Sequence, residues 1–174
     1  MSIDLILCGA SGRLGSEIVK ELENDSSIKL AACISSKNNP NIGKKISEFA
    51  DSSSDLKLQN SLKEVTKSDV ILDVSSPDFF EEILNFSKSN NVPLIVASTG
   101  HNEEQLNALQ KLSQSIAIMV APNLSRGINL IKNLFNSSPF HSLTNDIEIH
   151  ETHHKDKIDS PSGTAIELKN LLES

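Results

Sequence analysis

The feature that most constrains the fold of this chain is the alternation of short apolar runs with amphipathic stretches through residues 1–122. The apolar runs are too short for helices and match buried strands, whereas the stretches between them carry apolar residues every three or four positions, as helices do. Strands that alternate with helices build a parallel sheet with helices on both faces. The sequence therefore predicts an α/β fold with a doubly wound parallel sheet.

The pattern places each expected element. Strands are predicted at residues 3–7, 28–34, 69–75, 93–99 and 116–122, and helices at residues 12–24, 61–68, 77–90 and 103–114. In the first helix Leu14, Ile18 and Leu22 recur every four residues, so we expect this side to face the core. Residues 1–123 are thus predicted to form one domain.

A different rhythm begins after that domain, and residues 124–174 are predicted to form part of a second, α+β domain. A helix is expected at residues 124–138, with Ile128, Ile131 and Phe135 facing inward. Alternation and a β-branched threonine favour a strand from Ile147 to His153. A last helix follows from residue 163, where Thr164 and Glu167 fit a capping box.

Charge and cysteine usage exclude several classes of protein. Sixteen basic and twenty-three acidic residues give a net charge of -7, which argues against nucleic acid or an anionic membrane as a partner. Cys8 and Cys33 lie inside apolar runs, as reduced buried thiols do. No signal peptide or membrane-spanning run is evident. We expect a soluble cytoplasmic protein.

A glycine-rich turn links the first strand to the first helix. Gly9, Gly12 and Gly15 stand where the backbone must turn sharply, let a pyrophosphate approach and present free amides at a helix N-terminus. This context favours nucleotide binding over a tight turn without a ligand. At the end of the second strand Ser35, Ser36 and Lys37 offer donors and no carboxylate, which favours NADPH over NADH unless Lys37 is only a solvated loop residue.

The segment His150-Glu151-Thr152-His153-His154 matches the zinc signature H-E-x-x-H. That signature needs a helix, because in a strand residues four apart lie about 13 Å from each other. The predicted strand therefore argues against a metal site, and histidines that are only hydrogen-bonded or solvated remain an alternative.

Further along the chain, the amides and hydroxyls around Ser162, Gly163 and Thr164 suit a carboxylate, although capping of a helix alone would also explain them.

Taken in order, the motifs "GASGRLG", "DVSSPDFF", "ASTGHNEEQ", "APNLSRGIN" and "ETHHKDKIDSPSGTA" resemble the 4-hydroxy-tetrahydrodipicolinate reductase (dihydrodipicolinate reductase) family over the whole chain. The resemblance implies a Rossmann-type dinucleotide-binding domain followed by a substrate and oligomerisation domain. It also implies NADPH- or NADH-dependent reduction of a small cyclic dicarboxylate in lysine and diaminopimelate biosynthesis.

The resemblance assigns roles to individual positions. It implies that His153 is the general acid with Lys157 as its partner, and that the substrate carboxylates meet His154, Ser162, Gly163 and Thr164. It implies that the cofactor phosphates meet Gly9, Arg13, Leu14 and Gly15, its adenosine end meets Ser35, Ser36 and Lys37, and its nicotinamide side meets Ser98, Thr99, Gly100, Ala121, Pro122 and Asn123. No metal is expected, because the predicted strand argues against a zinc site at His150 and His154.

Two departures from the family pattern matter. Members often carry an acidic residue where Ser35 stands, which weakens the case for NADH. Members also continue with further strands after the last helix, so the second domain is expected to be incomplete, either through truncation or as a natural short form. The uncovered strand at residues 147–153 is expected either to form a homo-oligomer or to be mobile. A catalytically silent NADP(H)-binding remnant and a zinc hydrolase are the two alternatives to the reductase.

Overall fold

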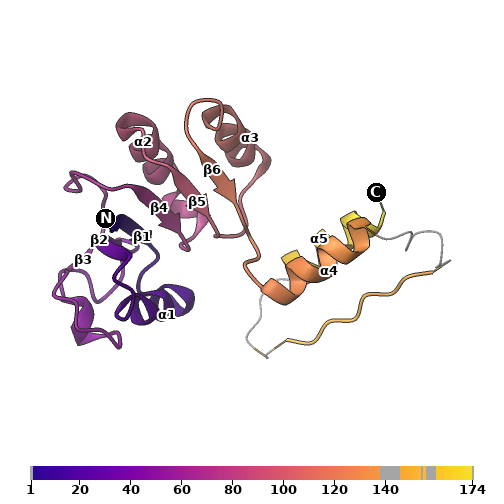
Figure 1. The fold of residues 1–174 in the computed structure, drawn as a ribbon, viewed down its shortest axis with the longest axis horizontal. Helices are drawn as coiled ribbons and strands as arrows, with labels where there is room; N and C mark the ends of the chain where they lie inside the picture. The colour runs from indigo at the N-terminus through magenta and orange to yellow at the C-terminus, as the bar shows by residue number, and fades with distance from the viewer. Residues whose placement is uncertain (1, 138–145, 154, 156–159, 174) are drawn as a thin grey trace. The chain divides into compact units, whose positions relative to one another are not determined.

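The computed structural model of the chain describes residues 2–137, 146–153, 155 and 160–173. The chain divides into two compact units, Met1–Pro122 and Asn123–Ser174. Figure 1 shows the sheet with its helices in the first unit, and α4 (Arg126–Ser137) and α5 (Gly163–Leu172) in the second. None of the helices in these described ranges is long and apolar enough to cross a membrane.

The first unit is built on a six-stranded sheet in which every strand pair is parallel, ordered β3-β2-β1-β4-β5-β6. Its strands are β1 (Ile3–Cys8), β2 (Ile28–Ile34), β3 (Leu58–Gln59), β4 (Val70–Asp73), β5 (Leu94–Val96) and β6 (Ile118–Val120). The order reverses between β1 and β4, which defines the doubly wound class. The predicted fold class is confirmed, although the short strand β3 had no recognisable signal.

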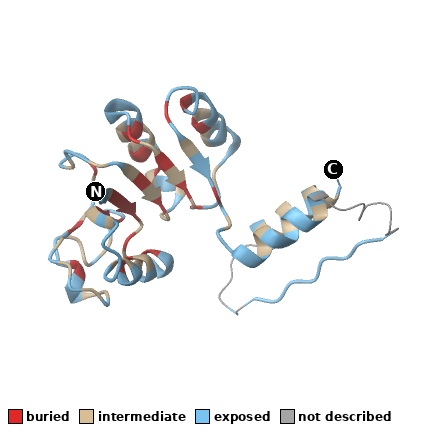
Figure 2. Ribbon diagram, viewed as in Figure 1, coloured by how far each residue is buried: buried red, intermediate tan, exposed pale blue. Residues whose placement is uncertain are grey.

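Helices cover both faces of this sheet. They are α1 (Arg13–Leu22), the 3-10 turn η1 (Ile46–Glu48), the 3-10 turn η2 (Pro77–Phe79), α2 (Phe80–Asn90) and α3 (Glu103–Leu112). On one face Ile6 and Cys8 of β1 pack in a buried cluster with side chains of α2 and α3. On the other face Leu7 and Cys33 pack with Val19 of α1. Figure 2 shows the buried positions gathered along the sheet and the helix sides that meet it.

Both cysteines are buried and free, as the apolar runs predicted. They belong to clusters on opposite faces of the sheet. Removal from water raises the pKa of the Cys33 thiol to about 12, and burial followed by repulsion from Asp73 raises the pKa of Cys8. Both thiols are therefore inert parts of the core at neutral pH.

The inward side of α1 differs from the prediction. Gly15 and Val19 are its buried residues, whereas Leu14 is 49% exposed and Ile18 and Leu22 are only half-buried. The reason is the close approach of this helix to the glycine turn, which brings Gly15 against Gly9 and rotates Leu14 outward.

The helix predicted at residues 61–68 is absent, and this prediction was wrong. Glu82 of α2 accepts hydrogen bonds from the Ser61 hydroxyl at 2.6 Å and from the Leu62 amide at 2.7 Å. These contacts anchor the start of the segment, and the Val65 amide then closes a single turn onto Leu62 at 3.1 Å. Tertiary hydrogen bonds have overridden a weak local preference.

In the second unit α4 (Arg126–Ser137) packs on α5 (Gly163–Leu172). Lys132 of α4 and Glu167 of α5 form an ion pair. Along α4, Ile128 and Phe135 are half-buried as predicted, but Ile131 is 38% exposed. Among the described residues α5 is the element that packs on α4, which explains the partial burial of its apolar side.

Two further predictions in this unit were wrong. Residues 147–153 are not a strand, because within the described parts of the chain no strand lies beside them to share backbone hydrogen bonds. The N-cap of α5 is Ser162, whose hydroxyl accepts the Ala165 amide at 3.1 Å. Thr164 lies inside the helix, and Glu167 is taken by Lys132, so they form no capping box.

Candidate functional site

The glycine turn lies at the carboxyl end of β1, beside the point where the strand order reverses. Gly9 adopts a φ of +91°, and a Cβ on it would lie 2.7 Å from the backbone carbonyl of Val74. A Cβ on Gly15 would lie 2.1 Å from the carbonyl oxygen of Gly9. Only glycine fits at these two positions, so the turn and α1 can pack this closely only with this sequence.

The turn presents donors to an anion. Gly12 donates to Gly9 at 2.9 Å and closes the turn, and Gly12, Arg13 and Leu14 are exposed. Within the described residues no backbone acceptor meets the amides of Arg13, Leu14 and Gly15 in the first turn of α1. Free amides, a helix dipole and an arginine together suit a pyrophosphate, so the residues present fit a dinucleotide.

The predicted adenosine residues behave differently from one another. Ser36 and Lys37 are exposed, but Ser35 is 8% exposed. The Ser35 hydroxyl lies 2.7 Å from that of Ser11, and Asn39 donates to both hydroxyls, at 3.2 and 2.8 Å respectively. Ser35 thus ties the end of β2 to the glycine turn, which leaves Ser36 and Lys37 as the groups open to a ligand.

Asp73, the last residue of β4, organises the two neighbouring loops and was not singled out from the sequence. Its carboxylate is 2% exposed and accepts the Ser75 amide at 2.9 Å, the Ser75 hydroxyl at 2.5 Å and the Ser98 hydroxyl at 2.5 Å. Its backbone carbonyl also accepts the amides of Ala97 and Ser98. A buried carboxylate that accepts several hydrogen bonds has its oxygens satisfied and fixes the loops around it.

His101 completes this network. Its Nε2 lies 2.9 Å from the Ser98 hydroxyl, and its ring lies 5.3 Å from that of Phe80 between centroids. Because Ser98 gives its single proton to Asp73, Nε2 of His101 must carry a proton and donate it. The Ser98 hydroxyl therefore both donates and accepts a hydrogen bond within the protein.

The remaining predicted nicotinamide residues fall in both units. Thr99 and Gly100 follow Ser98 and are exposed, with Gly100 at a φ of +87°. Ala121 ends the sheet at β6, where its amide donates to Val96 at 2.8 Å, and the exposed Pro122 follows it. In the first unit the carboxyl ends of β1, β2, β5 and β6 thus bring the predicted cofactor residues to one edge of the sheet. Asn123 opens the second unit.

In the second unit Glu151 joins His153, the predicted general acid, to Ser162, a predicted substrate-binding residue. One of its carboxylate oxygens lies 2.9 Å from Nε2 of His153, and the other accepts the Ser162 amide at 2.9 Å. Hydrogen bonds from the Ser162 hydroxyl, from its amide and from His153 lower the pKa of Glu151 to about 2. Glu151 was not among the predicted residues.

Two more predicted residues meet in this unit. Asn123 Nδ2 donates to Thr164 Oγ1 at 2.9 Å, which links the start of the unit to the first turn of α5, while Gly163 has open space around its Cα. His154 and Lys157 lie outside the described residues. Within the residues described, His, Cys, Asp and Glu side chains form no cluster of three that could hold a metal ion.

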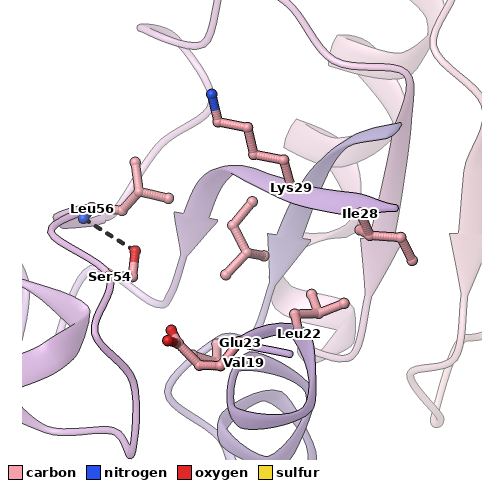
Figure 3. Close-up of a pocket in the computed structure, with 8 residues that line it drawn as sticks. Val19, Leu22, Glu23, Ile28, Lys29, Ser54 and Leu56 are labelled. Atoms are coloured by element: carbon pink, nitrogen blue, oxygen red, sulfur yellow. Dashed lines mark hydrogen bonds between the residues drawn. The ribbon is translucent and has the colours of Figure 1, made fainter. Parts of the chain in front are cut away.

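A surface hollow of about 290 Å³ lies elsewhere in the first unit, between the end of α1, the start of β2 and the loop at Ser54 (Figure 3). It sits at the amino ends of the strands, opposite the glycine turn, and so does not belong to the candidate site. Its walls are Val19, Leu22, Glu23, Ile28, Lys29, Leu30, Ser54 and Leu56.

These features define a class of protein. A six-stranded parallel sheet of order 3-2-1-4-5-6, with a glycine turn that fits pyrophosphate at its first β-α junction, is a Rossmann-type dinucleotide-binding domain. The model of the dihydrodipicolinate reductase N-terminus matches residues 3–124, and that of the dihydrodipicolinate reductase C-terminus matches residues 127–174. The chain belongs to the dihydrodipicolinate reductase family.

Individual relatives agree with this assignment. The chain is 37% identical to the 4-hydroxy-tetrahydrodipicolinate reductase of Buchnera aphidicola subsp. Cinara cedri, and 34% identical to that of Clostridium novyi, in each case over 97% of this chain and 63% of the relative. It superposes on dipicolinate-bound dihydrodipicolinate reductase from Paenisporosarcina sp. TG-14 with a TM-score of 0.70 and 28% identity, over 99% of this chain and 66% of that one. The chain thus spans a little under two thirds of these relatives.

Proposed function

We propose that this protein reduces 4-hydroxy-tetrahydrodipicolinate, or the dihydrodipicolinate formed from it by loss of water, to tetrahydrodipicolinate in lysine and diaminopimelate biosynthesis, with NADPH preferred over NADH. The observation that carries the proposal is the match of both halves of the chain, in order, to the two halves of one reductase family. The glycine turn with its free amides supports the dinucleotide, and the Paenisporosarcina relative binds dipicolinate. We place the reaction in the cytoplasm.

The proposal gives each unit its own task. Residues 1–123 hold the cofactor through the glycine turn, Ser36, Lys37 and the loops ordered by Asp73, and residues 124–174 form part of the substrate domain. When bound, the nicotinamide supplies a hydride. His153 donates the accompanying proton, Lys157 acts as its partner, and His154, Ser162, Gly163 and Thr164 hold the carboxylates. Positioned acid catalysis of this kind contributes about 10²- to 10⁴-fold.

Self-association is part of the proposal. Ile147 and Ile149 are 45% and 39% exposed in the segment that has no described strand beside it, and Leu130 of α4 is 60% exposed. Exposed apolar side chains along an unpaired extended segment are a surface that proteins cover or pair. We propose a homo-oligomer formed through residues 147–153, which light scattering would detect as a mass above that of the 18.9 kDa chain.

The test is an assay of NADPH oxidation with freshly generated substrate. His153→Gln should lower turnover by about 10²- to 10⁴-fold while nucleotide affinity, measured by calorimetry, stays unchanged. His150→Gln is the matched control, because His150 pairs only with the exposed Glu148 among the described residues. A chelator should have no effect. A chain that binds NADPH but turns over no substrate would instead be a nucleotide-binding remnant.

A further inference from the structure

Glu151 lies between the residue proposed as the acid and the start of α5, and its two oxygens have separate partners. One oxygen faces Nε2 of His153 and the other accepts the Ser162 amide, each at 2.9 Å. The carboxylate is thus held at one end by backbone that belongs to a helix N-cap. A carboxylate anchored in this way can fix the orientation of an imidazole at its other end.

We propose that Glu151 is a positioning residue that holds His153 in the Nε2-protonated tautomer and so reserves Nδ1 for proton transfer to substrate. The inference rests on the proposed function for its catalytic part, but the tautomer itself follows from geometry. An ionised carboxylate can only accept hydrogen bonds, so the nitrogen that faces it must carry the proton. With a pKa of about 2, Glu151 is ionised at neutral pH.

The proton balance is simple. The imidazolium carries a proton on each nitrogen, and the one on Nε2 is held by Glu151. Transfer of the Nδ1 proton to the reduced substrate leaves neutral His153 in the tautomer that Glu151 already stabilises. No side-chain rotation is needed, because solvent can then return a proton to Nδ1. Glu151 itself neither gains nor loses a proton.

A neighbouring pair provides an internal comparison. Glu148 and His150 have the same spacing in the chain and lie 3.0 Å apart, but their side chains are 83% and 84% exposed. Glu151 and His153 are 28% and 39% exposed. Only Glu151 has a second anchor at Ser162 among the described residues. We therefore expect a fixed tautomer at His153 and not at His150.

Substitution by glutamine should invert the tautomer. In Glu151→Gln the amide oxygen can still accept the Ser162 amide, so α5 keeps its start, but the amide NH₂ then faces His153. Nε2 must accept that hydrogen bond, and the proton moves to Nδ1. An imidazole with the wrong tautomer is a poor proton-transfer group, as the effect of the equivalent change in catalytic triads illustrates.

The experiment uses the full chain labelled with ¹⁵N-histidine, with His153→Gln to identify the His153 signals. The imidazole nitrogen shifts should report the Nε2-protonated tautomer in the wild type and in the control Glu148→Gln, and the Nδ1-protonated tautomer in Glu151→Gln. Substrate turnover in Glu151→Gln should fall about tenfold or more, with NADPH affinity unchanged. A wild-type His153 that carries its proton on Nδ1, or the same tautomer in the wild type and Glu151→Gln, overturns the inference. An absence of turnover in the wild type counts only against the proposed function, because the tautomer is measured without substrate.

Discussion

The Ser98 hydroxyl donates a hydrogen bond of 2.5 Å to the carboxylate of Asp73, across two neighbouring strands and a separation of 25 residues. Both residues are nearly inaccessible, at 6% and 2% exposed. The predicted role of Ser98 beside the nicotinamide stays a prediction, and this contact gives its hydroxyl a partner within the protein. The Ser98 side chain holds the loop to Asp73, and Thr99 and Gly100, which follow it, are exposed.

Removal of this hydrogen bond should destabilise the first unit. Ser98→Ala leaves a buried carboxylate oxygen without its donor, which costs about 1–3 kcal/mol of unfolding free energy. Chemical denaturation measures the change. Ser76→Ala is the control, because Ser76 is exposed and its side chain caps no helix, so its effect should stay within about 0.5 kcal/mol. Equal denaturation midpoints for the wild type and Ser98→Ala would show that the network adds nothing to stability.

The strands other than β3 could be predicted, as could the glycine turn, because each has a local sequence pattern. Apolar runs such as Ile3–Cys8 become strands wherever they are buried on both faces, and Gly9 and Gly15 mark the turn because no other residue fits there. The glycine turn is therefore recognisable from the order of its residues alone.

The rest depends on contacts between residues far apart in the chain. In the sequence nothing distinguishes Asp73 from other aspartates at strand ends, because its partner Ser98 lies 25 residues away. Glu82 likewise has the pattern of a surface residue of α2, although it binds Ser61 and Leu62. The segment around Ile149 carries a strand pattern, but a pattern supplies no partner for its backbone. The one feature of the sequence that could have indicated Glu151 is its position, as a carboxylate two residues before the proposed acid His153.

The glycine turn offers a sharp test of packing. In Gly15→Ala the new methyl group would meet the Gly9 carbonyl oxygen at 2.1 Å, so the turn or the start of α1 must move. We expect lower stability and a large loss of nucleotide affinity by calorimetry. Gly127→Ala, in α4, is the matched control. The nearest atom that its new methyl group would meet is the Ser125 hydroxyl oxygen at 3.8 Å, so alanine should be tolerated or stabilise that helix by about 0.5–1 kcal/mol. Unchanged NADPH binding in Gly15→Ala would contradict the site.

The preference between cofactors should depend on Lys37. A charge-assisted contact to the 2′-phosphate contributes roughly 1.5–3 kcal/mol, which is about tenfold or more in affinity. Lys37→Ala should therefore weaken NADPH binding by at least that factor and leave NADH binding nearly unchanged. Lys63→Ala removes an equal charge from another exposed position and should alter neither affinity. Calorimetry with both nucleotides decides, and equal affinities of the wild type for NADPH and NADH would remove this role from Lys37.

The contact between Glu151 and Ser162 should give the second unit a defined dependence on pH. The pKa of Glu151 is lowered from 4.5 to about 2 in the folded chain, so its ionised form favours the folded state. This contribution is fully present above the unfolded pKa and is lost as the pH falls from about 4.5 toward 2. The carboxyl ¹³C shift of Glu151 and the amide shift of Ser162 should titrate together in that window.

The variant Ser162→Ala removes the hydroxyl donor and the N-cap of α5. The midpoint of the Glu151 titration should therefore move toward 4.5, and the helix should lose about 1 kcal/mol of stability. Glu148 is the reference carboxylate, and a Glu151 titration that coincides with that of Glu148 would mean that the Ser162 anchor does not form in solution.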